Sequence, residues 1–66
     1  MLHFCPGVLE RVLADRQWTH RDLARAMGVS ASQVNRVLNG KRQPGRKFID
    51  GCLQLGLKFD DLWRND

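Results

Sequence analysis

Four polar residues recur at helical spacing between positions 32 and 39 of this 66-residue chain. They are Ser32, Asn35, Arg36 and Asn39, and steps of three and four residues place them on one side of a helix. Their side chains are a hydroxyl, two amides and a guanidinium, which can bond the edges of nucleic-acid bases. The set contains no Glu or Lys, the residues that a plain solvent-exposed face usually collects. We therefore expect this face to read bases.

The opposite side of the same segment is apolar. Val34, Val37 and Leu38 recur at i, i+3 and i+4, the spacing of a helix face that packs on a core. Ser30 followed by Gln33 resembles a capping box, and the pair Asn39-Gly40 is typical of a helix end. The sequence thus predicts a helix over 30–39.

The preceding segment has the signals of a second helix. Thr19 and Asp22 form another capping box, with Asp in place of the usual Glu, and Gly28 suits a left-handed helix end. The apolar stripe of this helix is Leu23, Ala24 and Met27. Only residues 28–30 separate the two helices, so we expect them to cross at a steep angle as a helix-turn-helix unit over about 19–40.

Three further helices complete the prediction, over 6–16, about 46–55 and 59–63. In the fourth helix the residues expected to face inward are Phe48, Ile49, Cys52 and Leu53, and Gly51 is expected to permit close helix packing. No segment has the alternating pattern of a strand. The expected fold is all-α, a compact bundle of about five short helices in one domain spanning 1–66. Its core is expected to contain Leu23, Val34, Val37, Leu38 and Phe48.

The positive charge is concentrated in the middle of the chain. The net charge is +4, and residues 20–47 hold seven Arg and Lys against one acidic residue, Asp22. Residues 1–19 are balanced and residues 48–66 are acidic. This distribution indicates a surface that binds a polyanion.

Residues 20–40, HRDLARAMGVSASQVNRVLNG, resemble the helix-turn-helix of the Cro and lambda-repressor-like (XRE) family. The matching features are Leu23-Ala24, Met27-Gly28, Val34, Val37 and Asn39-Gly40, and the likeness extends to 41–44, 55–57 and 60–63. The resemblance implies a sequence-specific transcriptional regulator, a repressor by type, that binds double-stranded DNA with the helix over 30–39 in the major groove. Two residues depart from the family: His20 stands where Gln is frequent, and Lys58 replaces the usual Ser or Thr cap.

Position then suggests a role for each residue. The expected base-reading residues are Ala31, Ser32, Gln33, Asn35 and Arg36, with Ala31 suited to a thymine methyl, Asn35 to adenine and Arg36 to guanine. The expected phosphate-binding residues are Thr19, His20, Asn39, Lys41, Arg42, Arg46 and Lys47.

Other functions have weaker support in the sequence. A zinc site built from Cys5, Cys52, His3 and His20 lacks the close ligand pairs that zinc sites usually have, so no metal or other cofactor is expected. No nucleophile–base pair, phosphate-binding glycine loop or carboxylate pair indicates an enzyme. We see no signal peptide or membrane span, and we expect a cytoplasmic protein.

Two questions about partners stay open at this point. The same fold can act as a protein-interaction module, such as an antitoxin or an anti-repressor, instead of binding DNA. A homodimer through the C-terminal turn at Phe59 and Trp63 is also expected, because one module contacts too few base pairs for high specificity and a symmetric dimer reads two half-sites.

Overall fold

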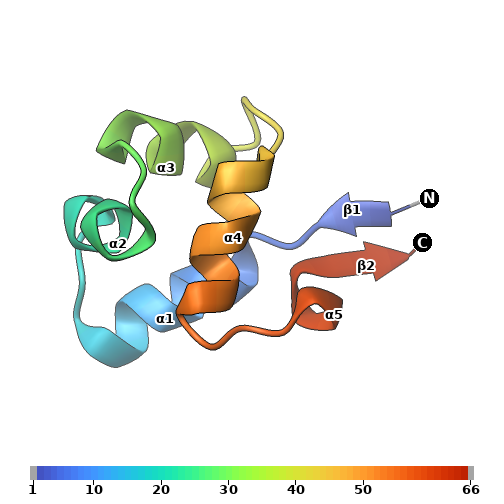
Figure 1. The fold of residues 1–66 in the computed structure, drawn as a ribbon, viewed down its shortest axis with the longest axis horizontal. Helices are drawn as coiled ribbons and strands as arrows, with labels where there is room; N and C mark the ends of the chain where they lie inside the picture. The colour runs from blue at the N-terminus through green and yellow to red at the C-terminus, as the bar shows by residue number, and fades with distance from the viewer. Residues whose placement is uncertain (1, 66) are drawn as a thin grey trace.

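The computed structural model describes residues 2–65, which form five helices and two short strands (Figure 1). The helices are α1 (Gly7–Arg16), α2 (His20–Met27), α3 (Ala31–Leu38), α4 (Arg46–Gln54) and α5 (Phe59–Leu62). The strands are β1 (Leu2–Phe4) and β2 (Trp63–Asn65). All five predicted helices are present, and the all-α class and the helical bundle are confirmed.

The two strands were not predicted, and the expectation that no strand would form is wrong. β1 and β2 pair antiparallel, with Phe4 opposite Trp63 and Leu2 opposite Asn65, and Figure 1 shows both chain ends on the same side of the molecule. A hydrogen bond from the Cys5 N–H to the Leu62 carbonyl, at 2.8 Å, continues this pairing. Three residues are too few for an alternating pattern, so only the meeting of the chain ends reveals the strands.

The helix-turn-helix unit is confirmed by its caps and its turn. Thr19 and Asp22 form the full capping box of α2, and Gly28 has the left-handed conformation (φ 73°) that ends this helix. Ser30 accepts a hydrogen bond from the Gln33 N–H at 3.1 Å, but the return bond of a capping box is not formed between these two residues. In Figure 1, α2 is seen nearly along its axis and α3 lies across the view, so the two helices cross steeply.

One side of every helix packs into the core. Its buried residues are Leu9, Leu23, Ala24, Met27, Val34, Val37, Phe48, Cys52 and Leu62. Four of the five predicted core residues are among them. The fifth, Leu38, is the last residue of α3, and it is only half-buried at the edge of the core.

The predicted inner face of α4 was too wide. Phe48 and Cys52 are buried, whereas Ile49 is half-buried and Leu53 is 42% exposed. Leu53 lies about 140° around the helix from Phe48, so it points away from the core, given 3.6 residues per turn.

Gly51 brings α4 against α2, as expected from its size. A Cβ atom built at Gly51 would lie 2.7 Å from both the Cβ and the carbonyl oxygen of Met27. This contact sets how closely α4 approaches α2 of the helix-turn-helix unit.

Candidate nucleic-acid interface

The outer face of α3 consists of the four polar residues that the sequence singled out. Ser32, Asn35, Arg36 and Asn39 are exposed, and they lie opposite the buried Val34 and Val37. The helix lies at one edge of the molecule, where a long partner can reach it (Figure 1). The buried valines hold this face in place, because rotation of α3 would remove both of them from the core.

The first turn of α3 is less open than its middle. Ala31 and Gln33 are half-buried, and Ala31 packs against the core. The backbone N–H of Gln33 is taken by the Ser30 hydroxyl. At this end of α3, Ser32 is therefore the most accessible residue, whereas Ala31 and Gln33 present only part of their side chains.

Asn35 and Asn39 are joined by a hydrogen bond that the sequence analysis did not predict. The Asn39 Nδ2 group donates to Asn35 Oδ1 at 3.0 Å. The four-residue spacing of two amides was the available signal, because such pairs meet on a helix surface. The bond orients Asn35 and leaves both hydrogens of its own amide group for another acceptor.

The start of α2 combines a filled cap with open backbone donors. The Thr19 N–H donates to Asp22 Oδ2 at 3.0 Å, and the Asp22 N–H donates to Thr19 Oγ1 at 3.2 Å. The bond from the Thr19 backbone lowers the pKa of Asp22, so this carboxylate is ionised at neutral pH. The N–H groups of His20 and Arg21 take no part in this box, so they and the Thr19 hydroxyl hydrogen can meet a phosphate.

The end of α3 is closed by a left-handed glycine that directs the basic loop. Gly40 has φ 75°, and the Lys41 N–H donates to the Arg36 carbonyl at 2.9 Å. This is the pattern of a Schellman motif, which reverses the chain sharply. Lys41 and Arg42 follow it directly, and both are exposed.

The N-terminus of α4 carries positive charge without a neutralising group. Gly45 occupies the cap position and has no side chain to bond the first N–H groups, and the first turn contains no acidic residue. Arg46 and Lys47 are exposed in that turn, where the helix dipole is already positive. Such a concentration of positive charge favours a bound anion.

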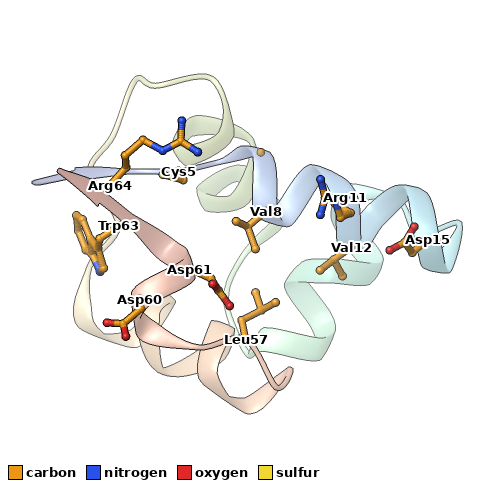
Figure 2. Close-up of a pocket in the computed structure, with 11 residues that line it drawn as sticks. Cys5, Val8, Arg11, Val12, Asp15, Leu57, Asp60, Asp61, Trp63 and Arg64 are labelled. Atoms are coloured by element: carbon orange, nitrogen blue, oxygen red, sulfur yellow. The ribbon is translucent and has the colours of Figure 1, made fainter. Parts of the chain in front are cut away.

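A groove of about 730 Å³ lies elsewhere, between α1 and the α5–β2 segment (Figure 2). Its apolar floor includes Val8, Val12 and Leu57, and Figure 2 shows Asp60 and Asp61 on one side of it and Arg11 on the other. None of the predicted site residues lines this groove. Arg42 lines a smaller hollow of about 270 Å³ beside β1, and no other predicted site residue lines either hollow. The candidate interface is therefore mainly an open surface.

Residues 2–65 contain neither a candidate metal site nor a candidate membrane span. No cluster of three or more His, Cys, Asp or Glu side chains in this part of the chain can hold a metal ion. Cys5 and Cys52 are both free thiols, and burial raises the pKa of the Cys52 thiol to about 11. No helix within the described range is long and apolar enough to cross a bilayer.

Comparison with known proteins gives two similarities. Residues 8–62 match the profile of a family described as the helix-turn-helix domain. The chain is also 38% identical over 55 residues to YvzC of Bacillus subtilis (strain 168), which is named as an uncharacterized HTH-type transcriptional regulator. That similarity covers 82% of this chain and 71% of the relative. No solved structure matches the chain significantly.

Proposed function

This chain belongs to the helix-turn-helix domain family, and we propose that it is a transcriptional regulator that binds double-stranded DNA with α3 in the major groove. The observation that carries this proposal is the outer face of α3, where Ser32, Asn35, Arg36 and Asn39 are exposed above a buried apolar side. A helix of this width fits the major groove, where each base pair shows a distinct set of donors and acceptors.

The base-reading residues lie on α3. Arg36 carries a planar guanidinium that matches the N7 and O6 acceptors of guanine. Asn35 donates through its free amide to adenine N7 and accepts from adenine N6 with its remaining lone pair. Ser32 and the open parts of Ala31 and Gln33 contact the base pairs nearest the start of α3.

The phosphate-binding residues form two groups, one at the start of α2 and one from the end of α3 to the start of α4. Thr19 and His20 hold a phosphate at the start of α2, and Lys41, Arg42, Arg46 and Lys47 hold others at the α3–α4 loop and the start of α4. Asn39 is a phosphate-binding residue next to the base-reading Asn35. One hydrogen of its amide is bonded to Asn35, and its oxygen and second hydrogen stay open for a phosphate contact. Contacts of this kind position the domain but do not read sequence.

In this function the chain binds DNA without catalysis and represses transcription by occupying its operator. Residues 1–66 act as one DNA-binding domain whose helix-turn-helix unit spans about 19–40. A test of this function therefore measures the affinity of the chain for DNA and not the turnover of a substrate.

We propose that two copies bind two half-sites about one helical turn apart, through the C-terminal turn. Phe59 is 53% exposed in this turn and packs against Trp63, with ring centroids 6.0 Å apart. Trp63 is half-buried and also packs on Phe4, so Phe59 supplies most of the free apolar surface. Sedimentation of the wild type and of Phe59→Asp tests this, and a wild type that stays monomeric on a non-palindromic site contradicts it.

The central test combines sequence selection with salt titration. We expect the chain to enrich one motif from a random DNA pool, and we expect log K to fall with log salt at about −0.9 per phosphate contact, for roughly four to six contacts per copy. An affinity for duplex DNA that does not change with salt would overturn the proposal. The fold would then be assigned to a protein-interaction module such as an antitoxin or an anti-repressor.

A further inference from the structure

The corner between α1 and α2 carries a cation that the interface described above does not use. Arg16 ends α1, and its guanidinium carbon lies 4.8 Å from the centroid of the Trp18 ring. Trp18 directly precedes Thr19, the cap of α2. We infer that Arg16, held by Trp18, is a further contact to the DNA backbone beside the start of α2. This inference rests on the proposed function.

The backbone of the corner is fixed in an unusual conformation. Gln17 has φ 55° and ψ 44°, the left-handed region that favours glycine. The Trp18 N–H donates to the Leu13 carbonyl at 2.9 Å, and the Gln17 N–H donates to the Ala14 carbonyl at 3.3 Å. These bonds fold the chain back so that Trp18 packs against the core beside the cap of α2. The corner therefore fixes the Trp18 ring in a position where it supports the Arg16 side chain.

Arg16 is free to bind an anion. Its side chain is exposed, and within residues 2–65 it contacts the Trp18 ring and forms no salt bridge. A guanidinium stacked on a ring keeps its N–H groups at the edge, where they can meet a phosphate in the same plane. Because the stack already restricts the side chain, less conformational entropy is lost on binding than for an unsupported arginine.

The start of α2, which follows Trp18 in the chain, also favours an anion. The start of α2 offers the open N–H groups of His20 and Arg21 and the positive end of the helix dipole. Arg16 adds a full charge three residues before the cap. The alternative is that Arg16 only shields the apolar face of Trp18, which is a structural role without any effect on DNA.

Arg11 offers a matched control on the same helix. It is exposed, as Arg16 is, but it lines the groove that faces Asp60 and Asp61 (Figure 2). Arg11→Ala and Arg16→Ala remove the same charge from α1 at different places. A general effect of net charge on DNA affinity would appear equally in both variants.

The experiment measures the binding of a labelled selected duplex, and of a random duplex of the same length, over a range of salt concentrations. We expect Arg16→Ala to bind both duplexes several-fold more weakly and to reduce the salt slope by about one unit. We expect Arg11→Ala to bind like the wild type, and Arg16→Lys to restore most of the slope because the charge returns. Thermal unfolding of each variant checks that the fold is intact.

A double-mutant cycle tests the part played by Trp18. Trp18→Leu should weaken DNA binding in the wild type and have no further effect in Arg16→Ala, because Trp18 acts through Arg16. An equal loss in both backgrounds would contradict the positioning role. If Arg36→Ala and Lys41→Ala weaken binding while Arg16→Ala behaves like Arg11→Ala, this inference fails and the proposed function stands. If the wild type shows no salt-dependent binding of DNA, the proposed function itself fails.

Discussion

Arg36 and Lys41 are both exposed and both positively charged, but they lie on different parts of the interface. Arg36 is on the outer face of α3, and Lys41 follows the left-handed Gly40 in the loop. A side chain on a helix in the major groove reaches base edges, whereas a loop beside the groove reaches only the backbone. The two residues therefore separate sequence reading from electrostatic attraction.

We expect Arg36→Ala to lose about 1–3 kcal/mol of affinity for the selected site and to relax the preference at one base pair. Its affinity for random DNA should change less. We expect Lys41→Ala to weaken both duplexes by similar factors and to reduce the salt slope by about one unit. Equilibrium titrations on the two duplexes measure both effects.

Arg36→Ala tests the role of α3 only if the variant remains folded, which its thermal unfolding shows. If a folded Arg36→Ala keeps both its affinity and its sequence preference, α3 is not the reading element. Arg36 would then be an ordinary surface residue, whose loss costs about 0–1 kcal/mol at most.

Cys52 makes the stability of the fold depend on pH in the alkaline range. It is fully buried, and burial raises the pKa of its thiol from 9.0 to about 11. The Cys52 thiol ionises less readily in the folded state than in the unfolded state. Its contribution to the free energy of unfolding is therefore fully present below about pH 9 and is lost as pH rises toward 11. Urea unfolding of the reduced protein between pH 7 and pH 10.5 should show this loss.

Two variants isolate the Cys52 contribution. Cys52→Ala removes the titrating group, so its stability should fall less steeply over the same pH range even though the variant is less stable overall. Cys5→Ser keeps Cys52 and should retain the steep fall of the wild type. Parallel pH profiles for Cys52→Ala and the wild type would contradict the prediction.

At the scale of elements, the packing of α4 on α2 determines the position of the α3–α4 loop. Gly51 on α4 and Met27 on α2 are in direct contact, and the loop with Lys41 and Arg42 connects α3 to the start of α4. A shift of α4 away from α2 would move one end of that loop and the positive N-terminus of α4. The close contact thus positions the phosphate-binding groups at this end of the interface.

We expect Gly51→Ala to destabilise the domain by about 1–3 kcal/mol, the usual cost of overpacking. The added methyl would lie 2.7 Å from the Met27 backbone oxygen, which cannot move aside as a flexible side chain can. This strain exceeds the gain of about 1 kcal/mol that alanine brings to a helix. Chemical denaturation measures the difference.

Gly7→Ala is the matched control for this prediction. Gly7 is also helical, and a Cβ atom there would meet nothing within 4 Å. It should therefore leave stability unchanged or raise it slightly. A Gly51→Ala variant that is as stable as Gly7→Ala would show that α4 can move away from α2 without cost.

At the scale of the whole molecule, the strand ribbon joins the two ends of the chain to the core. Phe4 on β1 packs edge-on against Phe48 of α4, with ring centroids 6.1 Å apart, and against Trp63 of β2 at 5.7 Å. Phe48 belongs to the same buried cluster as the core residues of the helix-turn-helix unit, such as Leu23 and Val34. The ends of the chain are thus part of one cooperative structure with the DNA-binding face.

We expect Phe4→Ala to cost about 2–3 kcal/mol, below the 3–5 kcal/mol of a fully buried phenylalanine, because Phe4 is half-buried. Leu2→Ala on the same strand should change stability by at most about 0.5 kcal/mol, because Leu2 is 59% exposed. Thermal unfolding of both variants measures this, and equal melting temperatures would show that the ribbon does not stabilise the core.

The sequence by itself determined the helices, the capping box of α2 and the side of α3 that faces outward. These features depend on residues within four positions of each other, as for Thr19 with Asp22 or Val34 with Val37, so local spacing carries the information. The family was also identifiable from this segment, because its turn and both helix ends lie within twenty-one consecutive residues.

The tertiary structure decided what depends on contacts between distant residues. β1 and β2 exist because the chain ends meet, which no local pattern of three residues can indicate. Leu53 is exposed because α4 turns a narrower face to the core than its apolar residues suggested. The contact of Arg16 with Trp18 depends on the left-handed conformation of Gln17, a residue whose type does not call for it. Burial, strand pairing and the placement of single charges arise from the packing of the whole chain.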